Sequence, residues 1–544
     1  MTVTSFPSIA SRTFPQAHSI EMISELLSSV LGGSQHLLIL LPTWTAALWI
    51  LWYCWKFILS PHFYKDEPPI YPYYIPFIGH LRSFIQDAGS LVKKAESCFG
   101  EGKLFGVQIA GKKLYIITSA EGTKEFYRNT TALDFTAFQL DTLKQFGMSP
   151  AGCKLMSKHI QGRTNGRDRI NIDLIVDVHH RNLHSSANLG QIASPVAEYI
   201  SNALRLETLP EQCIRFPGPR TEGKVVSLYT LCEEVILRAN ITGFWGNDLL
   251  DIAPDLVSTT STLDRRFHNL LLRIPRLLEP EVYNLRDKVL DYFDRYMDIP
   301  MKARTSLSPL IKELEQTSRD LGLSQRDIAV YHLAWLLASN NNIHAACFWV
   351  LAHLAESPDL ANKVREETAG IARNALSFSP AEALKDNQLP CLMALWREVL
   401  RFYGGPHTSG RHVQEDTVFT GKRLRRGASL LVATSTLQRD KAVWGADADE
   451  FVPNRFLRSP YLAKVANYRP FGGGISHCSG QHLAFVEMAM VVACLLDRFD
   501  MQIVPGVEET AFPQPFKAAP LLGIMHVREG DDKLVMLVPR LTGR

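Results

Sequence analysis

The sequence predicts a mainly helical fold with small β-sheets, preceded by a separate apolar segment near the N-terminus. Two observations carry this prediction: apolar residues recur at helical spacing over several long stretches, and short β-like stretches lie between them. With 544 residues, 46% of them hydrophobic and 21% charged, the chain is long and apolar enough to bury a large core. No internal repeat is apparent, so we treat the helical part as one domain.

The helical and β-like stretches can be placed along the chain. Segments with helical periodicity lie near residues 190–205, 226–245, 264–300, 324–356 and 389–403. Residues 104–107 and 113–118 flank Ala110 and Gly111, which predicts a small β-hairpin. Further β-like stretches occur near 417–435 and 521–538.

Composition excludes some classes of function. The formal net charge of +3 and the pI near 8.3 give no strong field, so we expect no nucleic-acid partner. The nine cysteines are scattered, with no C-x-x-C pair and no zinc-like clustering. This pattern is typical of a reducing compartment.

The N-terminal segment predicts one transmembrane helix over residues 37–59. Residues 37–55 carry no charge, and the apolar run continues after a single Lys56 to a length that approaches a bilayer span. A signal peptide is the alternative, but a long segment precedes the run and contains Glu21 and Glu25. We therefore expect an N-terminal extension over 1–36 and an anchor after it.

Two features follow the predicted anchor. Lys56 and Lys65 lie on its C-terminal side, which by the positive-inside tendency places the body of the protein in the cytosol. Residues 60–80 are predicted as a hinge, because four prolines between residues 68 and 76 favour a stiff, extended segment over a helix. The catalytic domain is then expected over 81–544.

The most informative stretch is FGGGISHCSG, residues 471–480. Its cysteine, Cys478, stands just before a predicted helix that begins at Gln481, where free amides and the helix dipole lower a thiol's pKa. The glycines at 472–474 allow the backbone to turn closely against a flat cofactor. We interpret Cys478 as a metal-ligating thiolate; the alternative is a buried structural cysteine beside an ordinary turn.

A second pattern predicts a buried ion-pair network. Glu398 and Arg401 are three residues apart, so they share one helix face and can pair. Arg455, in FVPNRF, can join them as a third member. We interpret these residues as a scaffold for the cysteine loop, since an isolated E-x-x-R is otherwise a solvated surface pair.

The order of E-x-x-R, F-x-P-x-R-F and F-x-x-G-x-x-x-C-x-G resembles the cytochrome P-450 superfamily, and the resemblance covers nearly the whole chain. It implies a cytochrome P-450 fold and a haem b whose iron takes Cys478 as its axial ligand. Phe471, Gly474 and Gly480 are implied as haem-contacting residues of the loop.

The resemblance also implies groups that hold the haem propionates. The position two before the cysteine is often basic in the family, but here it is Ser476. Other residues must then compensate. Arg411 resembles the strand arginine that pairs with a propionate, and His180, in DVHHRNLH, is a second expected contact.

The helix that crosses the distal haem face departs from the family pattern. Ser339, Asn341 and Asn342 stand where many members carry a glycine, an acid and a threonine, and ASNNNIHAACFWVL is similar to the subgroup with prostacyclin synthase and the bile-acid sterol hydroxylases. We predict Asn341 and Asn342 as catalytic, with Asn342 facing the oxygen site. An amide binds a ligand or water but cannot deliver a proton as an acid does. The alternative is a helix kink or an interhelical contact.

The resemblance implies a membrane-anchored monooxygenase that oxidises a lipophilic molecule of terpenoid, sterol or polyketide type with O2. Electrons are expected from NADPH through a separate flavoprotein reductase, because the chain shows no flavin or nicotinamide fingerprint. The expected location is the endoplasmic reticulum membrane, single-pass, with the body in the cytosol. Two alternatives stay open: a haem-thiolate isomerase or dehydratase of a peroxide-type substrate that needs no external electrons, and a non-catalytic haem or lipid-binding protein.

Overall fold

The structure is a computed structural model, and its two compact units are described separately. The first unit ends at Glu67 and the second begins at Pro68. The described residues are 41–164, 167–217, 223–304, 306–373, 388–407, 410–504, 512–517 and 523–540. The predicted extension over 1–36 and the first four residues of the predicted anchor lie outside them.

The first unit consists of one apolar helical segment. Residues 41–53 are helical and continue into η1 (Cys54–Leu59) and α2 (Ser60–Phe63). Large apolar side chains along this segment are exposed, among them Leu41, Trp44, Leu48, Ile50, Leu51, Trp55, Ile58, Leu59 and Phe63. A row of exposed leucines and tryptophans of this kind marks an interaction surface rather than an ordinary soluble helix.

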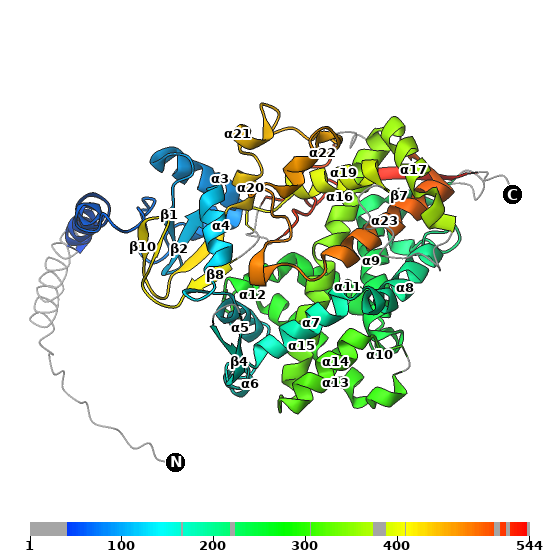
Figure 1. Ribbon diagram of the computed structural model, residues 1–544, viewed down its shortest axis with the longest axis horizontal. Coiled ribbons are helices and arrows are strands. Elements are labelled where there is room, and N and C mark those ends of the chain that lie inside the picture. Colours follow the sequence, from blue (N-terminus) through cyan, green and yellow to red (C-terminus); the bar gives the residue numbers. More distant parts are fainter. Residues whose placement is uncertain are drawn as a thin grey trace, which may run out of the picture. The chain divides into compact units, whose positions relative to one another are not determined.

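The second unit is predominantly helical, as the sequence predicts (Figure 1). Its α-helices are α3 (Leu81–Phe99), α4 (Ala120–Arg128), α5 (Phe135–Gln145), α6 (Pro150–Met156), α7 (Ile172–His184), α8 (Ser186–Ala203), α9 (Leu228–Trp245), α10 (Asp248–Ile252), α11 (Leu256–Arg266), α12 (His268–Leu271), α13 (Pro280–Asp298), α14 (Pro309–Asp320), α15 (Gln325–Asn340), α16 (Ile343–Glu356), α17 (Pro358–Arg373), α19 (Pro390–Phe402), α20 (Thr434–Leu437), α21 (Lys441–Trp444), α22 (Arg455–Arg458) and α23 (Gln481–Arg498). Short 3₁₀ turns are η2 (Glu211–Cys213), η3 (Met301–Ala303), η5 (Pro460–Lys464) and η6 (Gly474–Ser476).

Small sheets complete the unit. The strands are β1 (Phe105–Ile109), β2 (Lys112–Ile117), β3 (Leu133–Asp134), β4 (His159–Thr164), β5 (Arg167–Ile170), β6 (Ile214–Pro217), β7 (Lys224–Ser227), β8 (Gly410–Val413), β9 (Thr417–Phe419), β10 (Lys422–Leu424), β11 (Ser429–Val432), β12 (Phe499–Ile503) and β13 (Leu534–Pro539). They pair in the orders β1-β2-β11-β8-β3, β12-β13-β7-β6, β10-β9 and β4-β5. The predicted hairpin is confirmed, because β1 and β2 are antiparallel and join at Ala110 and Gly111, both at positive φ.

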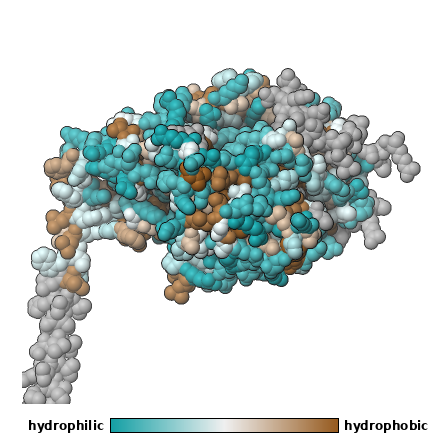
Figure 2. Space-filling view, turned by 60° about the horizontal axis from the view of Figure 1, so that its bottom comes forward, coloured by the Kyte–Doolittle hydropathy of each residue, from teal (hydrophilic) through white to brown (hydrophobic). Residues whose placement is uncertain are grey.

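The core lies among the long helices. One cluster of buried apolar side chains joins α8, α9, α16, α19 and α23, and a second joins α7, α11, α13, α14 and α15. Within the described residues, the segment 474–498, which ends in α23, is the one helical segment long and apolar enough to cross a membrane, but 72% of its most apolar 18-residue stretch is buried, so it is a core helix. The face in Figure 2 is mostly hydrophilic, with a few apolar patches.

Two predicted helices are wrong in extent. The segment 264–300 is not continuous, because α11 ends at Arg266 and α13 starts only at Pro280. Pro275 lies within this interruption, and Pro280 is the first residue of α13. Neither proline can continue a helix from the residues before it. The segment 324–356 breaks after Asn340, where the polar run predicted a kink.

The predicted ion-pair network is confirmed, and it is buried. The guanidinium of Arg401 donates to both carboxylate oxygens of Glu398 at 2.8 Å, and Arg455 Nε donates to Glu398 Oε1 at 3.2 Å. Glu398 and Arg401 are at most 1% exposed. The carboxylate also accepts the main-chain N–H of Val452 at 2.8 Å.

The remaining guanidinium protons of Arg401 bind main-chain carbonyls, and Arg455 also donates to the Asp447 carboxylate at 2.9 Å. Arg401 donates to the carbonyls of Gln438, Ala448 and Glu450 at 2.7–2.8 Å. Three chain segments around α19 are therefore fixed by one buried network in which every charge has partners. Such a network is stable only when complete, because an unpaired buried charge is costly.

Removing the carboxylate of this network should destabilise the protein strongly. Glu398→Ala leaves Arg401 buried without a counter-charge and Arg455 with Asp447 as its remaining carboxylate partner, so we expect the free energy of unfolding to fall by about 3–5 kcal/mol. Urea denaturation followed by tryptophan fluorescence measures the change. Arg276→Ala, which removes an exposed ion pair with Asp287, is the control and should give no resolved change. An equal effect of the two substitutions would contradict the structural role of Glu398.

Candidate functional site

The cysteine loop is a tight turn that ends at the first residue of α23. Gly472 and Gly474 have φ values of 71° and 57°, a region that favours glycine. The main-chain N–H of Cys478 donates to the Phe471 carbonyl at 2.9 Å, which closes the loop. Gly480 is the N-cap of α23, so the cysteine precedes the helix as predicted.

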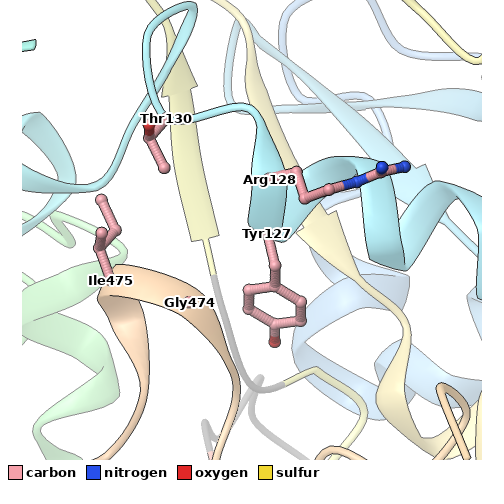
Figure 3. Close-up of a pocket in the computed structure, with 5 residues that line it drawn as sticks. All are labelled: Tyr127, Arg128, Thr130, Gly474 and Ile475. Atoms are coloured by element: carbon pink, nitrogen blue, oxygen red, sulfur yellow. The ribbon is translucent and has the colours of Figure 1, made fainter. Parts of the chain in front are cut away.

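The loop lies against the C-terminal end of α4. A Cβ added at Gly474 would stand 2.8 Å from the carbonyl oxygen of Tyr127, so only glycine fits this approach without movement. Figure 3 shows the aromatic ring of Tyr127 beside the loop. Tyr127, Arg128, Thr130, Gly474 and Ile475 line an open pocket of about 440 Å³ between the two elements.

Cys478 lies where solvent reaches it, although protein surrounds it on most sides. Burial raises the pKa of the thiol, while the main-chain amides of Gly480 and Gln481 lower it. The amide donors that the sequence predicts are thus present, but the expectation of a lowered pKa is wrong, because desolvation outweighs them. A cation is needed to make this sulfur a thiolate.

Arg411 lies in β8 with a fully buried side chain. Its Nη1 donates to the carbonyls of Phe126 at 2.5 Å and Asn129 at 3.0 Å, and its Nη2 lies 3.5 Å from Ser476 Oγ in the cysteine loop. Among the described residues no carboxylate pairs with it, and its Nε is buried without a partner. Burial lowers the pKa of this guanidinium to about 10.

Histidines gather beside the loop. His180 and His184 of α7 have ring centroids 4.9 Å apart, and His184 lies 6.2 Å from His482 of α23. The pKa of His477 is lowered by burial and then by repulsion from these neighbours. The structure therefore brings His180 to the surroundings of the loop. The sequence analysis did not single out His184 or His482; the i,i+4 spacing of His180 and His184 was the available signal.

His179 points to a different neighbour. Its ring stacks on Trp335 of α15, with centroids 4.6 Å apart. His179 Nε2 and Trp335 Nε1 are both buried and have no hydrogen-bond partner among the described residues. Buried ring nitrogens normally have partners, so this pair marks a place where a ligand group is expected.

Both predicted asparagines lie at the break between α15 and α16, and their side chains have protein partners. Asn341 Nδ2 donates to Asp264 Oδ1 at 2.5 Å, while Asn341 Oδ1 is buried without a partner. Asn342 Oδ1 accepts the main-chain N–H of Ile524 at 2.8 Å. The kink and the interhelical contacts are present; a contact of either asparagine with oxygen stays a prediction.

The residues around the loop suit a flat, anionic cofactor held by sulfur. A solvent-accessible thiol supplies a soft axial ligand, and glycines let the loop approach a ring closely. Buried Arg411 supplies an unpaired positive charge, and Ser476 Oγ supplies a hydroxyl beside it. Haem, with iron at its centre and two carboxylates at one edge, has these complementary groups.

Comparison with known sequences supports the same assignment. The model of the family "Cytochrome P450" matches residues 244–523. "Cytochrome P450 monooxygenase poxD" of Penicillium oxalicum is 26% identical over 85% of this chain and 92% of its own length. "Indoleacetaldoxime dehydratase" of Arabidopsis thaliana is 27% identical over 40% of this chain and 44% of its own length.

A solved structure shows the same fold. "Retinoic acid bound cyanobacterial CYP120A1" superposes with a TM-score of 0.67, covering 87% of this chain and 100% of the other at 19% identity. The family match spans more than half of the chain and includes the cysteine loop. The chain therefore belongs to the cytochrome P450 family and is a monooxygenase-type oxidoreductase with a haem-thiolate iron and electrons supplied by a redox partner.

Proposed function

We propose that this protein is a membrane-anchored monooxygenase that oxidises a lipophilic small molecule with O2 and electrons from NADPH, delivered by a separate flavoprotein reductase. One observation carries the proposal: the cysteine loop places an accessible thiol close to a buried arginine that has no carboxylate partner among the described residues. This pair of features suits a haem better than a structural cysteine, which would be packed and inert.

Cys478 is the proposed axial ligand. The amides of Gly480 and Gln481 donate toward its sulfur, so they stabilise negative charge there and orient the side chain. When haem is bound, its thiolate-ligated iron supplies the oxygen-activating chemistry. Phe471, Gly474 and Gly480 shape the loop against the ring.

Arg411 is the proposed partner of one haem propionate. Its guanidinium reaches the cysteine loop at Ser476, and a propionate would give it the counter-charge that the described residues do not supply. His180 is the proposed contact at the α7 side of the loop. His179 and Trp335, with unpartnered ring nitrogens, extend that side toward α15.

Asn341 and Asn342 are proposed to lie beside the oxygen site, where they stabilise the break between α15 and α16. Each amide is tied to another part of the fold, so the main chain between α15 and α16 is held open. An opened helix exposes carbonyls and amides to water or ligand in a way that a regular helix does not.

The anchor and the substrate class rest on apolar surface and on the relatives. The exposed apolar helix of residues 41–63 supports an N-terminal membrane anchor, with the body in the cytosol and the endoplasmic reticulum membrane as the location. The Penicillium relative is named a monooxygenase, and fungal enzymes of this kind support a substrate from specialised terpenoid, sterol or polyketide metabolism.

An isomerase or dehydratase is the second candidate, and one observation favours it. The predicted oxygen-side positions are amides, which cannot donate a proton as an acid can. The Arabidopsis relative, matched over part of its length, is named a dehydratase. Such a reaction needs no external electrons, so the electron requirement separates the two candidates. A non-catalytic role would give no product in either condition.

The carbon-monoxide difference spectrum of the reduced protein tests the axial ligand. We expect the red-shifted Soret band of a thiolate-ligated haem in the wild type and its loss in Cys478→Ala, because alanine has no donor atom. Cys98→Ala removes an exposed cysteine and should keep the band. A thiolate band that persists in folded Cys478→Ala would show that another residue is the ligand.

Substitution of Arg411 should separate haem binding from stability. Arg411→Met removes a buried charge that has no carboxylate partner in the described part of the chain, so the unfolding free energy of the apoprotein should change by less than about 3 kcal/mol. Haem retention should fall at least tenfold, measured by transfer of haem to an excess of apomyoglobin. Arg128→Met changes an exposed arginine of the pocket and serves as control. Unchanged haem retention in Arg411→Met would contradict the propionate assignment.

The electron requirement can be measured directly. Purified protein is incubated with a panel of lipophilic terpenoids, sterols and polyketides, with and without NADPH and a cytochrome P450 reductase. We expect an oxygenated product only with both, and ¹⁸O from labelled O2 in that product, since a monooxygenase inserts one atom of O2. Product formed without NADPH would select the isomerase or dehydratase.

A further inference from the structure

The three consecutive asparagines tie the helix break to three different parts of the fold. Asn340 Oδ1 accepts from Asn240 of α9 at 3.1 Å, and Asn342 Oδ1 accepts from the C-terminal segment at Ile524. Asn341 donates to Asp264 of α11. The middle asparagine thus bonds a carboxyl group that is only 5% exposed.

A buried set of titratable side chains surrounds that carboxyl group. One ligand atom each from Asp264, His344 and His526 lies within 4.8 Å of the other two, and all three residues are at most 6% exposed. Tyr229, 8% exposed, has its hydroxyl 3.2 Å from His344 Nε2 and 3.0 Å from His526 Nδ1. Four protonatable groups from four elements therefore meet behind the break.

The spacing of these atoms suits a hydrogen-bonded water better than a metal ion. No ion pair joins Asp264 to either histidine, so both carboxylate–imidazole separations lie between 4.0 and 4.8 Å. Zinc binds nitrogen and oxygen at about 2.0–2.2 Å, which draws its ligand atoms to roughly 3–3.6 Å from one another. A water accepts and donates at about 2.8 Å, which suits atoms roughly 4–4.6 Å apart.

The hydrogen bonds of the set run in one direction. His344 Nδ1 lies 2.8 Å from the Asn340 carbonyl, which only accepts, so this nitrogen carries a proton. In the neutral ring, His344 Nε2 then accepts from the Tyr229 hydroxyl. Tyr229 has a single proton, so its oxygen accepts from His526 Nδ1.

With these donors and acceptors, one ring nitrogen accepts no hydrogen bond from the described part of the protein. His526 Nε2 is buried and has no hydrogen-bond partner among the described residues. Asp264 Oδ1 already accepts from Asn341, so a proton on the carboxyl group is placed on Oδ2. A water between Asp264 Oδ2 and His526 Nε2 would accept from the first and donate to the second, which closes the chain.

The surroundings of Asp264 raise its pKa well above that of an ordinary aspartate, so that it is mainly protonated below about pH 6 and keeps a minor protonated fraction at pH 7. Burial raises the pKa of this carboxyl group to about 6, against the opposing effects of His344 and Asn341. Glu233 of α9 raises it further, and Arg265 of α11 lowers it.

The pKa of His526 is shifted so that its ring stays neutral. Burial lowers its pKa to about 3, and the neighbouring His344 lowers it further, while the main-chain carbonyl of Asn341 opposes both. The resting proton therefore belongs on Asp264 rather than on His526.

We propose that Asp264, bonded to Asn341 and continued by His526, Tyr229 and His344, holds the proton that the predicted oxygen site needs. The acid stands on α11 instead of on the broken helix. It positions the Asn341 amide by accepting from its Nδ2, and its proton reaches the oxygen site through water, because an amide does not relay a proton. The buried Oδ1 of Asn341, which has no partner among the described residues, is the acceptor that orients a water on the other side of the amide. Asp264 is thus a positioning residue in this proposal, which rests on the monooxygenase function proposed above.

The reaction consumes the proton in a balanced step. Monooxygenation converts a C–H bond, O2, NADPH and one proton into C–OH, water and NADP⁺. The two electrons come from NADPH, and one oxygen atom leaves as water with two protons. When the proton does not reach the oxygen atom that leaves as water, O2 takes up the two electrons of NADPH and two protons and leaves as hydrogen peroxide, and the substrate is not oxidised.

Infrared spectroscopy of the holoenzyme tests the protonation without any turnover. We expect a carboxylic-acid C=O band that titrates near pH 6 and is absent from Asp264→Asn. Glu487→Gln is the matched control: burial raises the pKa of Glu487 to about 8, so its own band should titrate higher and vanish only in that variant. Identical carboxylic-acid bands in the wild type and Asp264→Asn would overturn the proposal.

The pH dependence of the unfolding free energy is a second test of the raised pKa of Asp264, and the direction of the change can be predicted. Because the pKa of Asp264 is higher in the folded than in the unfolded protein, folding binds a proton between pH 4 and 6. The wild type should therefore lose stability relative to Asp264→Asn as the pH rises through this window, and urea midpoints measure the loss. A pH-independent difference between the two would contradict the raised pKa.

Coupling in the reconstituted enzyme tests the role in the reaction. With reductase, NADPH and a substrate identified as above, Asp264→Asn should keep the carbon-monoxide band while product formation falls about 10²-fold. Peroxide per NADPH should rise, and the pH profile of coupling should lose its step near 6. Tyr229→Phe, which removes only the bridging hydroxyl, should shift that step. Glu487→Gln should keep the coupling of the wild type.

The outcomes separate this proposal from the proposed function. Unchanged coupling and pH profile in Asp264→Asn would overturn the role of Asp264 while leaving the monooxygenase intact. Product without NADPH in the wild type would instead overturn the monooxygenase. One equivalent of zinc per protein, present in the wild type and lost in Asp264→Asn, would identify a metal site and overturn the water-bridged chain.

Discussion

The cysteine loop depends on a buried carboxylate 80 residues before it. Glu398 fixes two guanidinium groups, and these in turn bind the carbonyls of the segment from Gln438 to Glu450. That segment supports the approach to the loop, since Asn467 lies 3.2 Å from Asp440 Oδ2 and Tyr468 donates to the Arg397 carbonyl at 3.1 Å. The thiol is thus positioned by a network that never contacts it. A turn rich in glycine has little rigidity of its own, so this support is a physical requirement.

Two buried arginines show how charge distinguishes scaffold from site. Arg401 is fully partnered by a carboxylate and by three carbonyls, as a buried cation in a scaffold must be. Arg411 is as deeply buried, yet it has carbonyls and a long contact to Ser476 and no counter-charge among the described residues. Its hydrogen bonds and its contacts with the rings of Phe126 and Tyr127 supply no opposite charge. A bound dianion would supply that charge, which is why Arg411 points to the cofactor and Arg401 does not.

Local patterns in the sequence predicted much of this structure. The β1–β2 hairpin, the position of Cys478 before α23 and the pairing of Glu398 with Arg401 all depend on residues close in the chain or on strong motifs. The third member, Arg455, lies 57 residues from Glu398 and was placed by motif order. The prediction of one continuous helix from the apolar spacing failed between α11 and α13. The spacing of apolar residues continues across this region, but the prolines there prevent the backbone from being helical.

The contacts behind the helix break could not be predicted in the same way. Asp264 and Asn341 are 77 residues apart, and Asp264 stands in no motif that would point to Asn341. His526 lies still farther along the chain, in a C-terminal segment without regular structure over its first residues. Single-sequence patterns give residue types and local spacing, whereas this set arises from the packing of four elements. The raised pKa of Cys478 was missed for the same reason, since desolvation depends on packing from distant segments.

The asparagines therefore bear on the reaction through their partners rather than through their own chemistry. An amide neither donates an acid proton nor accepts one readily, so a sequence with amides at these positions favours a reaction without proton delivery. Asn341, however, binds a buried carboxyl group whose pKa is raised to about 6. Such a group takes up and releases a proton within about one pH unit of neutrality, which an isomerisation would not use. Keeping an acid buried at a cost in stability is understandable if the reaction consumes the proton, and this consideration favours oxygen activation over rearrangement at this site.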